Sequence, residues 1–264
     1  MADYFIGDIH GCYAEMLDLV KELNLTEQDQ LYFAGDLVNR GPESLETLRW
    51  VKDNSGKVVL GNHDLYLLAC YYEAIPHSYT HTFHRVVAAD ECCELMDWLI
   101  NQPLYRYFPD DKLLLLHAGL YPHWSLSEAC ALADEVSDFM RKRPKEFFAN
   151  MFGQEAISWA QASGREARHR FIVNAFTRMR YVDASGVLDF GSHKPPPHPE
   201  DRLKPWYEYL SDDLKIAFWH WSALGGFHPA RNVVALDGGC VWGNSLLAWN
   251  MQTGEWRTTK CLRS

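Results

Sequence analysis

The sequence has no apolar run long enough to cross a membrane. Among its 264 residues, no unbroken hydrophobic stretch approaches the roughly 20 residues that a bilayer-spanning helix needs. Residues 1–6 lack both the basic start and the longer apolar segment of a secretory signal. We therefore expect a cytoplasmic protein that makes no contact with a membrane.

Paired cysteines and an excess of basic residues are also missing. The seven cysteines are an odd number and include no Cys-x-x-Cys pair, which favours reduced thiols over a disulfide framework. The chain has 25 Lys and Arg against 35 Asp and Glu, a formal net charge of -10. Because such a surface repels nucleic acid in general, an anionic substrate must be captured locally, by metal ions and a few arginines.

The sequence contains no internal repeat and no low-complexity tract. Its composition, 47% hydrophobic and 23% charged, is that of an ordinary globular protein. The proline-rich residues 191–205 are expected to form a linker or a wrapping loop. No change in composition there marks a domain boundary, so we expect residues 1–264 to form a single α/β domain.

Polar residues follow each of the first three predicted strands. These strands are expected at residues 3–6, 31–34 and 57–60, and each precedes a segment with helical apolar spacing. Three such units predict parallel strands whose following loops meet at one edge of a sheet. Pro42 can occupy the first turn of the second helix, where its missing N–H would have no partner. The polar residues of the three loops are Asp8, His10, Asp36, Asn62, His63 and Asp64.

Two later strands end at histidines. Strands expected at residues 113–116 and 215–218 lead into His117 and His220. Between them, Ser125 and Glu128 predict a capping box for a long helix. That helix is expected to run to about Arg143, with helical sequence continuing to Thr177 and a hairpin turn at residues 183–186. Another strand is expected at residues 104–108. Further strands at residues 233–236, 246–249 and 256–259 make the second half of the chain mainly antiparallel.

Six of these polar residues form a candidate metal-ligand set. They are Asp8, His10, Asp36, Asn62, His117 and His220. Carboxylate, imidazole and amide ligands without a thiolate suit Mn²⁺ or Fe²⁺ better than a structural zinc. If Asp36 bridges two ions, the set provides seven ligand positions, enough for a two-metal site. In contrast, His77, His81 and His84 have no accompanying cysteine or evident helix, and they favour a solvated or substrate-facing loop.

Four sequence blocks resemble the signature of the phosphoprotein-phosphatase-type metallophosphoesterases. These blocks are residues 7–11, 35–41, 61–64 and 117–119. More narrowly, the chain resembles the bacterial symmetrical diadenosine tetraphosphatases over nearly its whole length. The segments that carry this second resemblance are residues 61–65, 174–180, 204–206, 218–221 and 236–243.

The resemblance implies a fold, a site and an activity. The fold is a β-sandwich of mixed sheets flanked by helices, with a dinuclear metal site at the carboxyl ends of the strands. One metal ion would be held by Asp8, His10 and Asp36, and the other by Asp36, Asn62, His117 and His220. The implied ions are two divalent metals, Mn²⁺ first, with Co²⁺ or iron as alternatives. The implied reaction is hydrolysis of diadenosine tetraphosphate to two ADP, with nucleoside-tetraphosphate caps of RNA as further substrates.

The same resemblance assigns catalytic roles. His63 would be the general acid, accompanied by Asp64 and Asn39, and Arg40 would bind phosphate. The wider family has aspartate where this chain has Asn39, so His63 should be less often protonated at neutral pH. The tetraphosphatases usually have glycine before the last histidine ligand, and Trp219 is expected to crowd the backbone there.

Arg178 and Arg180 are further candidates for binding phosphate, since arginine can grip a phosphate with two hydrogen bonds. One residue separates them, so we expect at most one to face the site; for each, a surface ion pair is an equal alternative. Two other functions stay open at this point. One is a Ser/Thr or Tyr protein phosphatase with the same metal centre, and the other is a catalytically silent nucleotide sensor.

Overall fold

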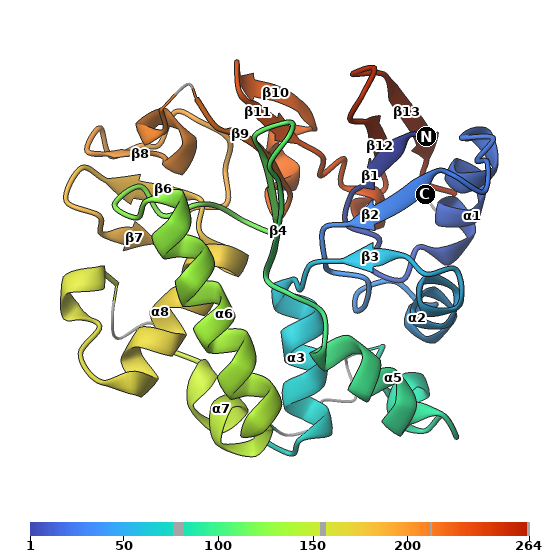
Figure 1. The fold of residues 1–264 in the computed structure, drawn as a ribbon, viewed down its shortest axis with the longest axis horizontal. Coiled ribbons are helices and arrows are strands. Elements are labelled where there is room, and N and C mark those ends of the chain that lie inside the picture. Colours follow the sequence, from blue (N-terminus) through green and yellow to red (C-terminus); the bar gives the residue numbers. More distant parts are fainter. Residues whose placement is uncertain (76–81, 154–156, 212, 263–264) are drawn as a thin grey trace.

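Two five-stranded β-sheets pack face to face in the computed structural model, which describes residues 1–75, 82–153, 157–211 and 213–262 (Figure 1). The first sheet has the order β13 (Trp256–Lys260), β12 (Ser245–Asn250), β1 (Asp3–Ile6), β2 (Gln30–Phe33) and β3 (Lys57–Val58). The second has the order β10 (Phe227–Ala230), β11 (Val233–Ala235), β9 (Lys215–Phe218), β5 (Leu113–Leu116) and β4 (Tyr105–Phe108). A smaller sheet contains β7 (Leu188–Asp189), β6 (Tyr181–Asp183) and β8 (Leu203–Pro205). The predicted sandwich of mixed sheets is confirmed.

Helices cover the outer faces of this sandwich. Figure 1 shows α1 (Tyr13–Glu22) and α2 (Ser44–Asp53) beside the first sheet. On the opposite side of the molecule lie α6 (Leu126–Lys142), α7 (Pro144–Met151) and α8 (Arg165–Arg178). The remaining described α-helices are α3 (Asn62–Tyr71), α4 (His84–Val87) and α5 (Cys92–Ile100). None of the described helices is both long and apolar enough to span a bilayer.

Alternate strand residues fill the space between the two large sheets. Phe5 of β1 and Trp249 of β12 meet Leu115 of β5 and Ala217 of β9 in one buried cluster. The neighbouring Ile6 belongs to the other buried cluster, which includes the apolar faces of the helices. Burial of a side chain such as Phe5 contributes roughly 1.5–3 kcal/mol. Because the central strands are buried on both faces, they read as continuous apolar runs in the sequence.

Each large sheet contains three neighbouring parallel strands. In the first sheet β1, β2 and β3 are parallel, which confirms the prediction for the first three strands. In the second sheet β9 pairs in parallel with both β5 and β11. The prediction that the second half of the chain is mainly antiparallel holds for β6, β7, β8, β10, β12 and β13, and β9 is the exception. The long connection after β5 brings the chain back in the same direction, as parallel pairing requires.

Local features agree with the sequence in part. The Ser125 side chain accepts a hydrogen bond from the Glu128 N–H (3.2 Å) and caps α6, as predicted. Pro42 does not lie in the first turn of α2, because Glu43 caps that helix and Ser44 begins it. The short helix α4 at His84 was not expected. The other two histidines of that segment, His77 and His81, lie outside the described residues.

Candidate metal centre

The carboxyl ends of five parallel strands bring all six predicted ligands to one region. Asp8 and His10 follow β1, Asp36 follows β2, Asn62 follows β3, and the two remaining histidines follow β5 and β9. All except His117 line one cavity of about 380 Å³. His117 is fully buried, and its Nε2 lies 3.5 Å from Asp36 Oδ2 and 3.2 Å from Asn62 Oδ1. The predicted location at the strand ends is therefore confirmed.

The backbone at this edge adopts conformations that are rare for residues other than glycine. His10, Asp36 and His220 have φ angles of 47°, 48° and 68°. Such left-handed residues cost free energy and are concentrated at functional sites. Gly61 permits the close packing of two of the loops, because a Cβ at that position would collide with Asp36 Oδ1.

Backbone carbonyls orient two of the histidines. His10 Nδ1 lies 3.1 Å from the Val38 carbonyl oxygen, and His117 Nδ1 lies 2.6 Å from that of Ala34. A carbonyl oxygen can only accept, so each Nδ1 carries the proton and donates it. The lone pair of each Nε2 is then available to a metal ion, which is the usual arrangement around metal-bound histidines.

Asp36 occupies the position between two groups of ligands. Its Oδ2 lies 3.7 Å from His10 Nε2 and 3.5 Å from His117 Nε2. On one side, His10 Nε2 is 3.9 Å from Asp8 Oδ2. On the other, His117 Nε2 is 3.2 Å from Asn62 Oδ1, and His220 completes a group with Asp36 and His117. The spacing fits two cations that share the Asp36 carboxylate.

Two buried atoms of the centre lack a protein partner. Among the described residues, Asp8 Oδ1 and His220 Nε2 are buried and accept no hydrogen bond. Leaving a buried polar atom unpaired costs about 1–3 kcal/mol. Burial and the nearby Asp237 and Asp36 carboxylates raise the pKa of Asp8 well above its usual range. Divalent cations at the two ligand groups would satisfy these atoms and remove this repulsion, so the residues fit a metal centre.

Without a metal ion, burial and neighbouring charges also shift the pKa values of Asp36, His117 and His220. Burial opposes ionisation of Asp36, but the charges of His117 and His63 hold its pKa well below the usual range. Burial likewise opposes the charge on His117, and Asp36 nevertheless raises the pKa of that histidine. A metal ion would displace the His117 proton, since metal binding requires the neutral imidazole. Burial and Arg180 lower the pKa of His220, which keeps its lone pair free.

Asp64 lies behind the centre and lines neither of the cavities described here. Its side chain is fully buried and accepts backbone hydrogen bonds from Asp36 (2.8 Å), Leu37 (3.0 Å) and Gly61 (3.0 Å). Burial and the Asp36 charge raise its pKa to about 7. Both carboxylate oxygens are thus engaged by backbone N–H groups, and the catalytic role expected for Asp64 stays a prediction. Its contacts make it a positioning residue that holds the Asp36 loop against the start of α3.

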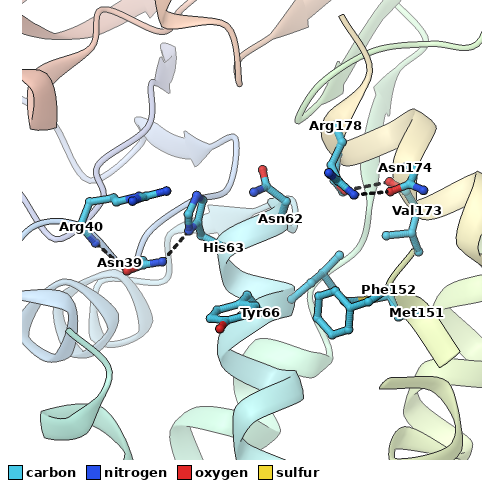
Figure 2. Close-up of a pocket in the computed structure, with 12 residues that line it drawn as sticks. Asn39, Arg40, Asn62, His63, Tyr66, Met151, Phe152, Val173, Asn174 and Arg178 are labelled. Carbon is cyan, nitrogen blue, oxygen red and sulfur yellow. Dashed lines mark hydrogen bonds between the residues drawn. The ribbon is translucent and has the colours of Figure 1, made fainter. Parts of the chain in front are cut away.

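Asn39 determines which nitrogen of His63 carries a proton. The Arg40 N–H donates to Asn39 Oδ1 (2.8 Å), so the Asn39 amino group must face His63 Nδ1, 2.7 Å away (Figure 2). An amino group only donates, which makes Nδ1 the acceptor and leaves the proton on Nε2. Burial lowers the pKa of His63 to about 4, even though Asp36 acts to raise it. Burial is the first cause of this shift, and the effect of Asn39 on the protonation of His63 stays a prediction.

Three arginines reach the centre from different elements. Arg40 and Arg178 approach from opposite sides of α3, with Asn62 and His63 between them (Figure 2). Arg180 donates from Nη2 to the His220 carbonyl oxygen (2.8 Å). Both Arg178 and Arg180 line the metal-centre cavity, so the expectation that at most one would face it is wrong. The helix ends at Arg178 and Met179 is extended, and in extended chain residues two apart point to the same side.

A second cavity of about 340 Å³ adjoins the first and is drawn in Figure 2. The two cavities share four lining residues, which are Arg40, Asn62, His63 and Arg178. Away from the metal centre its wall becomes apolar and includes Tyr66, whose ring meets that of Phe152 at 6.0 Å with a T-shaped geometry. This wall, from α3, α7 and α8, can contact a flat aromatic group.

Sequence reasoning missed Asp237. It follows β11, is buried, and lines the first cavity beside Asp8 and His10. The signal was present as a carboxylate after an apolar strand and before two glycines. Trp219 lines neither cavity, and its indole fills the space between the sheets with Phe5 and Leu236. Its Nε1 packs against the backbone beside Asp8, since a Cβ at Gly7 would lie only 2.8 Å from it.

Comparisons with known proteins agree with this geometry. The model of the calcineurin-like phosphoesterase family matches residues 4–164. A symmetrical bis(5'-nucleosyl)-tetraphosphatase of Coxiella burnetii is 43% identical, over 98% of this chain and 91% of that protein. A protein of the same name from Psychromonas ingrahamii is 40% identical, over 100% and 98% of the two chains.

Two solved structures share the fold. One, provisionally assigned as a diadenosine tetraphosphatase, has a TM-score of 0.68 and 20% identity over 100% of this chain and 95% of that chain. The other is a protein serine/threonine phosphatase from Saccharomyces cerevisiae, with a TM-score of 0.55 and 16% identity over 100% and 81% of the chains. At these identities the two structures establish the similarity of fold.

Proposed function

Because this chain belongs to the symmetrical bis(5'-nucleosyl)-tetraphosphatases within the calcineurin-like phosphoesterase family, we propose that it hydrolyses diadenosine tetraphosphate to two ADP. The observation that carries the proposal is the pair of adjoining cavities that share Arg40, Asn62, His63 and Arg178. A phosphate chain bound across this shared wall has space for a nucleoside on each side. RNA 5' ends with a nucleoside-tetraphosphate cap present the same phosphate chain, so they belong to the proposal as well.

The ligand groups hold two divalent ions in this proposal. Asp8, His10 and Asp36 bind the first ion. The residues that bind the second are Asp36, Asn62, His117 and His220. Nitrogen and oxygen ligands favour Mn²⁺, with Co²⁺ or Fe²⁺ as alternatives. When bound, such ions neutralise phosphate oxygens and activate water for in-line attack at phosphorus.

The arginines and aromatic residues bind the substrate. Arg40, Arg178 and Arg180 face the cavities with guanidinium groups that can each grip a phosphate through two hydrogen bonds. At one end, Tyr66 and Phe152 offer ring faces and edges to an adenine. At the other, the ring of Trp242 is 59% exposed and its centroid lies 5.6 Å from the Arg40 guanidinium carbon. Two aromatic ends around a basic centre favour a dinucleotide over a phosphopeptide.

His63 donates a hydrogen bond to the leaving group. With Nδ1 occupied by the Asn39 amide, its proton is at Nε2. A neutral imidazole supplies a hydrogen bond but not a full proton, which the general-acid role predicted from the sequence would require. ADP can leave without one, because a terminal phosphate has a second pKa of about 6. A serine alkoxide cannot, so this pair favours anhydride substrates.

Replacing Asn39 should change the preference for the leaving group. In Asn39→Asp the carboxylate can accept from His63 Nδ1, which favours the doubly protonated ring. We expect the ratio of kcat/KM for alkyl phosphomonoesters to kcat/KM for diadenosine tetraphosphate to rise about tenfold. His63→Ala should reduce the rate for alkyl esters more than for anhydrides or aryl esters. If His63→Ala lowered the rate equally for leaving groups of very different pKa, His63 would not be the residue that assists the leaving group.

Product analysis tests the proposed activity directly. Manganese-loaded protein is incubated with diadenosine tetraphosphate and, separately, with a phosphoserine and a phosphotyrosine peptide. The expected result is ADP as the only nucleotide product, with negligible phosphate release from either peptide. AMP plus ATP as main products would overturn symmetrical cleavage. Faster dephosphorylation of a peptide would favour the protein phosphatase, and tight binding of the nucleotide without turnover would favour the nucleotide sensor.

The cytoplasm is the proposed location. The structure joins none of the seven cysteines in a disulfide, which is the state that a reducing compartment maintains. Fractionation of cells that express the tagged protein, with activity measured in each fraction, tests the location.

A further inference from the structure

A second group of potential metal ligands lies outside the catalytic cavities. Cys12, Glu15 and Cys240 each offer one ligand atom, and these three atoms lie within 4.8 Å of one another. All three residues are almost completely buried, with exposed fractions of 1%, 0% and 2%. None of them lines the cavities of the metal centre. The group is therefore separate from the machinery described above.

Widely spaced segments contribute to this cluster. Cys12 is the N-cap of the ten-residue helix α1, and Glu15 lies in its first turn. Cys240 begins the 3₁₀ turn Cys240–Trp242, in the connection from β11 to β12. Cys261 follows β13, and its Sγ lies 3.7 Å from Glu15 Oε1. Four potential ligands from three parts of the chain meet beneath the first sheet's edge.

Within the described part of the chain, the Glu15 carboxylate has one oxygen without a hydrogen-bond partner. Its Oε1 accepts hydrogen bonds from the Leu262 N–H (3.1 Å) and from Cys261. Among the residues that the structure describes, its Oε2 is buried and makes no hydrogen bond. The positive end of α1 gives partial compensation, but thiol groups are only weak donors. A buried carboxylate with an unpaired oxygen, surrounded by three cysteines, has the composition of a cation site.

We propose that Cys12, Glu15, Cys240 and Cys261 bind a structural zinc-class cation. Thiolate sulfur with one carboxylate oxygen is a ligand set that selects Zn²⁺ over Mn²⁺ or Mg²⁺. Tetrahedral bonds of about 2.3 Å to sulfur and 2.0–2.2 Å to oxygen place ligand atoms about 3.5–3.8 Å apart. The ligand atoms of Cys12, Glu15 and Cys240 lie within 4.8 Å of one another, and Cys261 Sγ lies 3.7 Å from Glu15 Oε1, so side-chain rotation must bring the four together. Binding releases the thiol protons to solvent as the metal replaces them.

The position of the site suggests what it holds together. Cys12 comes directly after the loop of Asp8 and His10, and Cys240 comes three residues after Asp237. A cation between them joins loops that leave different sheets and meet at the metal centre. The same 3₁₀ turn carries Trp242 towards Arg40. A cation at this site would thus hold together the two loops that carry Asp8, His10 and Asp237. This structural role is independent of which substrate the catalytic centre binds.

Cobalt substitution distinguishes this site from the catalytic centre. Thiolate ligands give Co²⁺ an intense near-ultraviolet charge-transfer band, whereas nitrogen and oxygen ligands do not. We expect the band in the full-length protein and also in Asp36→Asn, which impairs the catalytic centre alone. Cys240→Ser and Glu15→Gln should lose the band or weaken it severalfold, together with about one equivalent of bound metal per chain. Cys93→Ala, at an exposed cysteine outside the cluster, is the matched control.

Two results would overturn the proposal. One is cobalt-loaded, full-length protein without a charge-transfer band. The other is a Cys12–Cys240 disulfide, found by mass spectrometry of peptides from protein purified under native conditions. If Cys240→Ser fails to fold by circular dichroism, native mass spectrometry of Asp36→Asn decides instead. A retained zinc ion that protects the cysteines from alkylation supports the site, and alkylation at the same rate with and without chelator contradicts it.

Discussion

Asp36→Asn should remove turnover and metal binding together. The Asp36 Oδ2 atom lies between His10 Nε2 (3.7 Å) and His117 Nε2 (3.5 Å), so one carboxylate serves both proposed ions. An amide of the same shape keeps the contact to the His63 N–H but loses the negative charge. We expect kcat/KM to fall at least about 1,000-fold, equivalent to about 4 kcal/mol of transition-state stabilisation.

Metal content and kinetics are measured on the same preparations. Atomic emission gives metal ions per chain, and the release of ADP gives kcat/KM. Asp18→Asn, on the exposed side of α1, controls for the loss of one negative charge from the protein. Retention of two ions per chain with near-normal turnover in Asp36→Asn would show that the shared-carboxylate arrangement is wrong.

Asp64→Ala should produce the largest loss of stability among the substitutions considered. The Asp64 carboxylate accepts hydrogen bonds from the backbone N–H groups of Asp36, Leu37 and Gly61, all of them buried. Each donor left unpaired costs about 1–3 kcal/mol, and partial relaxation makes the sum smaller than three separate losses. We expect the free energy of unfolding to fall by about 3–5 kcal/mol.

Urea unfolding of the metal-free protein measures this loss, since bound metal would otherwise contribute to the apparent stability. Asp64→Asn keeps one acceptor oxygen, so its free energy of unfolding should lie between those of the wild type and Asp64→Ala. Asp53→Ala, exposed at the end of α2, is the matched control. A change within about 0.5 kcal/mol for Asp64→Ala would mean that other groups satisfy these backbone donors.

The sequence alone determined which residues end the strands. Apolar runs bounded by glycine placed Asp8, Asp36 and Asn62 after parallel strands, and they placed His117 and His220 after two more. These features depend on neighbours within a few residues, so local rules suffice. The capping of α6 by Ser125 was predictable for the same reason. The six candidate ligands followed from these strand ends together with the family resemblance.

The tertiary structure decided what depends on distant neighbours. Asp237 lines the site because β11 is parallel to β9, which the sequence did not indicate. Asp64 is a positioning residue because its oxygens accept from two N–H groups of the Asp36 loop and from that of Gly61 at the start of its own helix, although it follows His63 directly.

Residues far apart in the chain show the same dependence most clearly. Arg178 and Arg180 converge on one cavity only because the helix ends between them. Cys12, Cys240 and Cys261 look like unrelated single thiols in the sequence, and packing brings them around Glu15. Short-range spacing specifies which side chain a strand or a helix presents. Which groups that side chain meets, and hence its charge state and its chemistry, is set by the packing of the two sheets and the loops between them.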